Sequence, residues 1–193
     1  MQVIAVLLLL TIPYINYYYY YYYYMAKARS GKFQIRKTLD GMTSGTTVSE
    51  IDLGAYVDPA DAQGVEILAV DFIWHAASTN LPITSGTDFR AVAQLKDNIN
   101  GNIVGFENTH LVASAGLTFD ANAGVYNTTD IFPDMLYLSK DGGRIVVNDV
   151  LEFCMKGSGT VSDAACTVVI DARIVGLTKK DYMALALTTV ASE

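Results

Sequence analysis

The residues able to do chemistry in this chain are few and widely spaced. There are two cysteines, Cys154 and Cys166, and two histidines, His75 and His110. Protein zinc sites commonly bring cysteines and histidines together at short spacings such as CxxC, and the sequence contains no such pair. We therefore expect structural histidines and buried free thiols, with a disulfide between successive strands as the alternative. No metal and no other cofactor is predicted.

Motifs for nucleophilic catalysis and for phosphate binding are also missing from the sequence. It has no G-x-S-x-G, no Walker loop and no G-x-G-x-x-G. The nearest match, Gly-Ser-Gly at residues 157–159, has no helical pattern after it and is predicted to be a loop. Acidic residues near the predicted turns lack the order of a calcium-binding loop. We therefore predict that the protein is not an enzyme.

Strand patterns dominate the segments that must position these residues. Residues 65–75 are rich in β-branched and aromatic side chains, which predicts a long strand buried on both faces. Residues 89–95 alternate apolar and polar side chains, as in a strand with one face towards solvent. Residues 135–139 and 144–155 are predicted to form a hairpin through the turn Lys-Asp-Gly-Gly. Further strands are expected at residues 32–39, 48–53, 103–106, 111–113 and 166–177.

Helical signals are few: residues 60–63, after Pro59, are a candidate for one helical turn, and at the C-terminus Thr178 and Asp181 have the spacing of a capping box. Without alternation of strands and helices, a parallel-sheet enzyme is disfavoured. The sequence predicts an all-β fold, an antiparallel β-sandwich of the jelly-roll or Greek-key kind with about eight strands and a short C-terminal helix, over residues 32–193. Residues 116–129 are predicted to be a long exposed loop, and the candidate subunit-contact residues are Phe119, Tyr126 and Phe132.

Residues 1–24 form a leader that we expect to lie outside the fold. Residues 3–12 are apolar except for Thr11, residues 17–24 are eight consecutive tyrosines, and no charge precedes Lys27. One interpretation is a mis-assigned start, with translation beginning at Met25. The other is an apolar membrane or export segment, although the positive region and the cleavage site of a secretory signal are missing.

Residues 25–37 are predicted to be a basic N-terminal arm that runs into the first strand. An arm of this charge, attached to an acidic body, is suited to contacting nucleic acid through phosphate neutralisation. The alternative is that the charges only solubilise a flexible terminus. The arm holds five of the chain's 13 basic residues: Lys27, Arg29, Lys32, Arg36 and Lys37.

The basic segment Ala26-Lys27-Ala28-Arg29-Ser30-Gly31-Lys32, leading directly into about eight strands, resembles a small viral or phage coat protein of the single jelly-roll type. The resemblance is one of architecture and covers residues 25 to about 177. It implies self-assembly into a symmetric capsid, with the arm against the genomic nucleic acid inside and the sandwich edges and loops forming the shell. The implied partners are copies of this chain and the genome, and the implied location is a virion assembled in the host cytoplasm.

Two other functions remain open. A secreted or surface-anchored β-sandwich module, of the adhesin or carbohydrate-binding type, would use residues 1–24 as its export segment and lie at the cell surface. A cupin-like jelly-roll enzyme would need a cluster of metal-binding histidines, whereas the two histidines here are far apart in the sequence.

Overall fold

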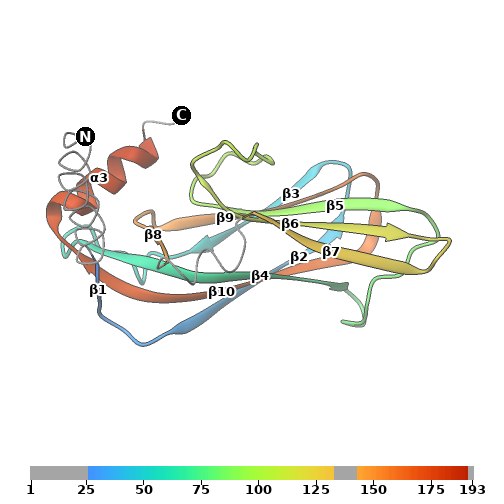
Figure 1. Ribbon diagram of the computed structural model, residues 1–193, viewed down its shortest axis with the longest axis horizontal. Helices are drawn as coiled ribbons and strands as arrows, with labels where there is room; N and C mark the ends of the chain where they lie inside the picture. The colour runs from blue at the N-terminus through green and yellow to red at the C-terminus, as the bar shows by residue number, and fades with distance from the viewer. Residues whose placement is uncertain (1–25, 133–142, 191–193) are drawn as a thin grey trace, which may run out of the picture.

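The computed structural model describes residues 26–132 and 143–190, which form two antiparallel sheets stacked face to face and one helix (Figure 1). Sheet A contains β1 (Ala26–Ala28), β2 (Phe33–Met42), β4 (Gln63–Ala76), β8 (Arg144–Val146) and β10 (Val161–Leu177). Sheet B contains β3 (Thr46–Asp52), β5 (Phe89–Lys96), β6 (Leu111–Asp120), β7 (Val125–Phe132) and β9 (Val150–Gly157). The helix α3 (Lys179–Val190) follows β10 directly.

The strands pair as a long hairpin that has been rolled up. β2 pairs with β10, β3 with β9, β4 with β8 and β5 with β6, so that each successive pair lies inside the previous one along the chain. Two further pairings, β10 with β4 and β9 with β5, join these hairpin pairs into the two sheets. This is the jelly-roll topology. It confirms the predicted fold class, while β1 and β7 extend the sheets beyond the eight nested strands.

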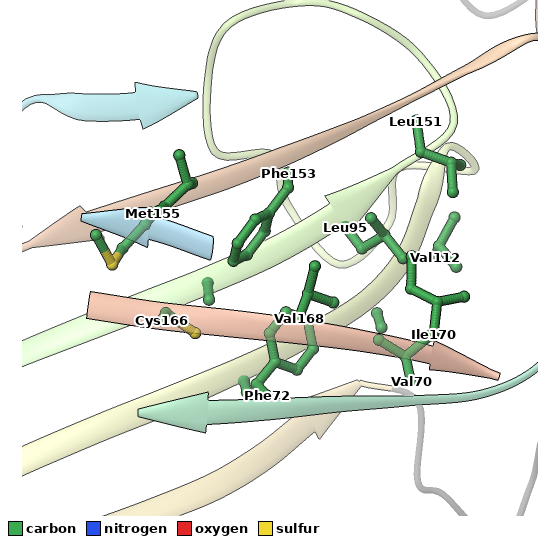
Figure 2. Close-up of a cluster of buried hydrophobic side chains, with 14 of the residues drawn as sticks. Val70, Phe72, Leu95, Val112, Leu151, Phe153, Met155, Cys166, Val168 and Ile170 are labelled. Carbon is green, nitrogen blue, oxygen red and sulfur yellow. The ribbon is translucent and has the colours of Figure 1, made fainter. Parts of the chain in front are cut away.

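The core lies between the facing surfaces of the two sheets, here called their inner faces (Figure 2). Since side chains alternate along a strand, β10 places Cys166, Val168 and Ile170 on its inner face, all fully buried. Phe72 from sheet A and Phe153 from sheet B meet with ring centroids 6.2 Å apart. Each such buried apolar side chain contributes about 1.5–3 kcal/mol relative to exposure, so this layer is what holds the sheets together.

The predicted single strand over residues 144–155 is wrong, because the chain there crosses from one sheet to the other. β8 pairs with β4 in sheet A, whereas β9 lies between β3 and β5 in sheet B. Hydrogen bonds hold the crossing: Leu53 donates its N–H to the Asp149 carbonyl at 2.6 Å, and the Asn148 amide donates to the Asp97 carbonyl. The predicted partner strand, residues 135–139, lies outside the described residues. Residues 103–106, predicted as a strand, lie in a loop.

The two cysteines lie in different sheets, so the successive strands that carry them do not pair. Cys154 is on the outer face of β9, and Cys166 is on the inner face of β10. Both are buried free thiols, as expected.

The exposed loop predicted over residues 116–129 is instead a hairpin of β6 and β7. A carboxylate oxygen of Asp120 accepts the backbone N–H groups of Asn122 and Ala123, at 2.9 and 3.1 Å. Gly124 then adopts a positive φ of 64°, which glycine tolerates without strain. These four turn residues, 121–124, are enough to reverse the chain.

The C-terminal helix forms as predicted. The Asp181 N–H donates to the Thr178 hydroxyl oxygen at 3.2 Å, and that hydroxyl donates to the Asp181 carboxylate at 2.6 Å. Tyr182 anchors the helix because it packs against Ala62 and Val147 in a small cluster separate from the main core.

Candidate assembly and nucleic-acid surfaces

The edge strand β7 is the first candidate contact surface. It pairs with β6 from Asp120↔Val125 to Ser114↔Phe132, with an irregularity next to Ile131. Its apolar side chains are open to solvent: Val125 is 57% exposed and Ile131 is 44% exposed, and Tyr126 is also exposed. β7 is therefore an apolar strand at the margin of sheet B.

The predicted contact residues separate in the structure. Phe119 lies on the inner face of β6, buried and stacked on Phe89 with ring centroids 5.3 Å apart. It is therefore part of the core, and its assignment to a surface loop is wrong because strand alternation turns it inwards. Tyr126 is exposed on β7, as a contact residue must be. Phe132 ends β7, and its side chain lies outside the described part.

The predicted basic arm is built into sheet A rather than free of it. β1 pairs with the end of β10 and β2 with its first two thirds, so only a short connection at residues 29–32 lies between strands. The reason is the sequence of β2, in which Phe33 and Ile35 alternate with charged or polar residues and pack against the core. Arg36 and Lys37 are consecutive strand residues, so they point to opposite faces of the sheet.

The fold nevertheless gathers exposed positive charge at one end of the molecule. Lys27 is the strand partner of Gly176, and the helix α3 opens three residues later with Lys179 and Lys180. Figure 1 shows β1 and α3 at the same end of the molecule. We call the group the basic end and define it as the exposed residues Lys27, Arg29, Lys32, Lys179 and Lys180.

Sequence reasoning missed Lys179 and Lys180 because nothing in their spacing links them to the N-terminal lysines. The Arg29 guanidinium donates to the Gln63 side-chain oxygen at 3.3 Å and to the Asp61 carbonyl at 3.2 Å. Arg173, although nearby in the sheet, is paired with Glu66 at 2.6 Å and is left out of the basic end.

The helix α3 presents a second apolar surface. Met183 and Leu187 are four residues apart, so they share one side of the helix, and both are more than half exposed. The opposite side carries Tyr182, which faces the sandwich. This surface lies at the same end as the basic end and far from the β6–β7 turn (Figure 1).

The loop between β5 and β6, residues 97–110, folds over the outer face of sheet B as a strap. Gln94 holds it in both directions, donating to the Val104 carbonyl at 2.9 Å and accepting the Val104 N–H at 2.8 Å. Beneath it, Lys96 and Glu152 form an ion pair at 2.5 Å between side chains 0% and 2% exposed. Gly101 of the strap donates its N–H to the same carboxylate.

The strap determines the titration of the groups beneath it. Burial alone would raise the pKa of Glu152, but hydrogen bonds from Cys154, Lys96 and the Gly101 N–H together lower it below its usual value. Burial, followed by the hydrogen bond to Glu152, raises the pKa of Cys154 to about 12. The carboxylate is therefore charged and the thiol protonated at neutral pH.

Both ends of the strap are tied to sheet A. Asp97 accepts from His110 at 2.7 Å and from the Arg144 guanidinium at 2.6 Å. Arg144, at the start of β8, also donates to the Leu111 carbonyl at 2.9 Å and the Thr109 carbonyl at 2.6 Å. His110 thus has a structural role, as predicted, and the strap links β8 to the opposite sheet.

The described residues contain neither a metal-binding cluster nor a helix that could cross a membrane. In residues 26–132 and 143–190, His, Cys, Asp and Glu side chains do not gather in groups of three or more that would hold a metal ion. Over the same residues, no helix has the length and apolarity that crossing a membrane requires.

Comparison with known proteins gives structural matches alone. No protein-family model matches the chain, and no curated protein matches it in sequence. A chain of desmodium yellow mottle tymovirus matches at 9% identity and a TM-score of 0.37, over 76% of this chain and 86% of that one. VP1 of Trichodysplasia spinulosa-associated polyomavirus matches at 11% identity and a TM-score of 0.37, over 79% and 98% of the two chains.

A chain of maize chlorotic mottle virus is similar at 12% identity and a TM-score of 0.31, over 77% of this chain and 96% of that one. Viral capsid proteins are thus among the solved structures that this chain is similar to. With TM-scores of 0.31–0.37, the resemblance is one of architecture.

Proposed function

We propose that this protein is a structural subunit that assembles with copies of itself into a symmetric shell, as a viral or phage coat protein does, and that its place is the virion. The observation that supports the proposal is that one subunit has two separate exposed apolar surfaces, the β7 edge and the exposed side of α3. A single self-complementary patch produces only a dimer, whereas a closed shell needs at least two different contacts per subunit.

The arrangement of the exposed apolar side chains supports a role for both surfaces in contacts between subunits. Isolated exposed apolar side chains are ordinary on soluble proteins. Here, however, Val125, Tyr126 and Ile131 follow one strand at the margin of a sheet, and Met183 and Leu187 share one side of one helix. Apolar groups gathered in this way are typical of surfaces that become buried in an assembly.

The basic end gives the proposed shell an inner side. Its five exposed cations lie on a chain whose net charge is −7, with Asp61 and Asp181 as acidic neighbours. We propose that the basic end contacts the phosphates of a packaged nucleic acid, which requires positive charge and no sequence-reading motif.

The test is electron microscopy and sedimentation of the purified 193-residue chain, alone and with single-stranded nucleic acid. Shells or defined oligomers are the expected result, and a chain that stays monomeric at high concentration in both conditions would overturn the proposal. For the nucleic-acid part, replacing Lys179 and Lys180 with glutamine should weaken binding and reduce its salt dependence by about two phosphate contacts. The matched control replaces Lys156, which is exposed on β9 in sheet B.

A further inference from the structure

We propose that β7 pairs with β7 of a second copy across a two-fold axis that passes through Thr128, joining sheet B of both subunits into one continuous antiparallel sheet. This inference rests on the proposed function, because it names one of the contacts through which the copies would assemble.

The backbone of β7 favours pairing with a further strand. A strand inside a sheet uses hydrogen-bonding groups on both of its edges, and an unpaired edge is a template for another strand. Within residues 26–132 and 143–190, β7 has β6 as its single partner strand. β7 is also outside the eight nested strands of the jelly roll, so it adds an edge that the fold itself does not require.

The other margin of sheet B is less suited to pairing with its own copy. There the edge strand is β3, which carries the exposed acids Glu50 and Asp52. Charged side chains on an edge strand discourage pairing, and two copies of an acidic edge repel each other. β7 has Asp130 as its sole charged residue over eight positions. Of the two margins, β7 is thus the one suited to pairing with its own copy.

The order of side chains along β7 fits a two-fold axis at Thr128. A two-fold axis perpendicular to the sheet keeps the outer faces of both copies on the same side, so residues pair when they share a face. With the axis at Thr128, Val125 comes to lie beside Ile131 of the second copy, the residue at the irregularity of β7, which brings two exposed apolar side chains together. Tyr126 then lies opposite Asp130, and the two Asp130 carboxylates are kept apart.

The faces of β7 agree with this register. Val125 is the partner of Asp120, whose side chain is on the outer face of β6, and Gly116 has the same parity along β6. Ile131 also lies over the outer face, since its Cδ1 atom is 2.9 Å from where a Cβ at Gly116 would stand. Val125 and Ile131 are thus on one face of the strand, and the axis brings them together between copies.

A cysteine scan on the full chain tests the register. Residues directly opposite each other in an antiparallel pair have Cα atoms about 4.5–5.5 Å apart, within the range that a disulfide spans. Under mild oxidation, Thr128→Cys should give a cross-linked dimer, whereas Val125→Cys and Ile131→Cys should each cross-link poorly alone and efficiently when mixed. The two native cysteines are buried and do not compete.

Charge exchange at the same position tests the contact without a covalent bond. Thr128→Lys and Thr128→Glu should each raise the dimer dissociation constant about tenfold, because like charges then face each other at the axis. An equimolar mixture of the two should return to within about threefold of the wild-type value. Val48→Lys, at an exposed position on β3, is the matched control and should leave the dissociation constant unchanged.

The outcomes separate this inference from the proposed function. If oligomers form but Thr128→Cys cross-links no better than Val125→Cys, the β7 pairing is wrong and self-assembly stands. If Val48→Lys weakens association as much as Thr128→Lys, β7 meets β3 of the next copy in a head-to-tail contact, and the two-fold is refuted. A monomeric wild-type chain under all conditions refutes both proposals.

Discussion

Replacing Lys96 with methionine should destabilise the protein more than any surface change, because the lysine lies beneath the strap with no access to solvent. Its ammonium group forms the 2.5 Å ion pair with Glu152 and also donates to the Asn102 carbonyl at 2.5 Å. Methionine fills a similar volume but supplies no charge. The Glu152 carboxylate would then keep only the Gly101 N–H and the Cys154 thiol as partners.

The size of the effect follows from that buried carboxylate. Breaking a buried ion pair by removing one partner costs about 3–5 kcal/mol, since the remaining charge is uncompensated. With a urea dependence of roughly 2 kcal/mol per M, the unfolding midpoint should fall by about 1.5–2.5 M. Changing both residues, as Lys96→Met with Glu152→Met, should cost less than the single change because no buried charge is left.

The assay is urea unfolding followed by the fluorescence of Trp74, the single tryptophan of the chain, which is buried in the core. Lys156→Met is the matched control, an exposed lysine on β9, and should shift stability by no more than about 0.5 kcal/mol.

The pH dependence of the stability difference between the wild type and the Lys96→Met variant tests whether the charge on Glu152 causes it. In the folded wild type the pKa of Glu152 is lowered from 4.5, so its contribution is present above about pH 4.5 and is lost as the pH falls through the folded value. Protonation relieves the buried charge in the variant, so the gap between the two proteins should narrow on acidification. A cost below about 1 kcal/mol at pH 7, or a gap that stays constant down to pH 3, would refute this account of the strap.

Three further predictions follow from single contacts. Because burial raises the pKa of both thiols, Cys154 and Cys166 should react with a thiol reagent at pH 8 only after unfolding, and rapid labelling of the native chain would contradict this. Gly64→Ala should lower thermal stability by about 1–3 kcal/mol, since its Cβ would stand 2.9 Å from the Val146 carbonyl oxygen and push β8 off β4. Thr178→Ala removes the cap of α3 and should cost about 1 kcal/mol, measurable by the same urea assay, whereas Thr178→Ser should cost little.

Local sequence patterns were sufficient to predict some of the secondary-structure elements. The alternation at residues 89–95 and the capping pair Thr178 and Asp181 each specify their element without help from distant residues. The long strand predicted at residues 65–75 exists as β4, but its outer face is only partly covered, since Asp71 and Ile73 are exposed. The run of apolar residues thus predicted the strand correctly, but it did not predict which face of the strand is buried.

The predictions from sequence failed where contacts between distant segments determine the structure. Residues 144–155 have no glycine or proline to mark the crossing between sheets, and the break is held by bonds to Leu53 and Asp97, far away in the sequence. Gln94 and Lys96 follow the alternation expected for a strand face that is open to solvent. In the structure the strap covers this face of β5, so both side chains are buried. The basic residues at the N-terminus belong to strands that pair with β10. Their own local sequence does not reveal this pairing.

The position of β10 in sheet A bears on how the protein is made. This strand follows all the other described strands in the sequence, yet it lies between β2 on one side and β4 on the other. While the ribosome is still translating, the nascent chain therefore holds two strands with open edges and no central strand to join them. Folding that depends on contacts between distant segments is slow and exposed to aggregation. Sheet A can thus be completed only once β10 has been synthesised, and until then the edges of β2 and β4 that β10 will cover are open to pairing with other chains.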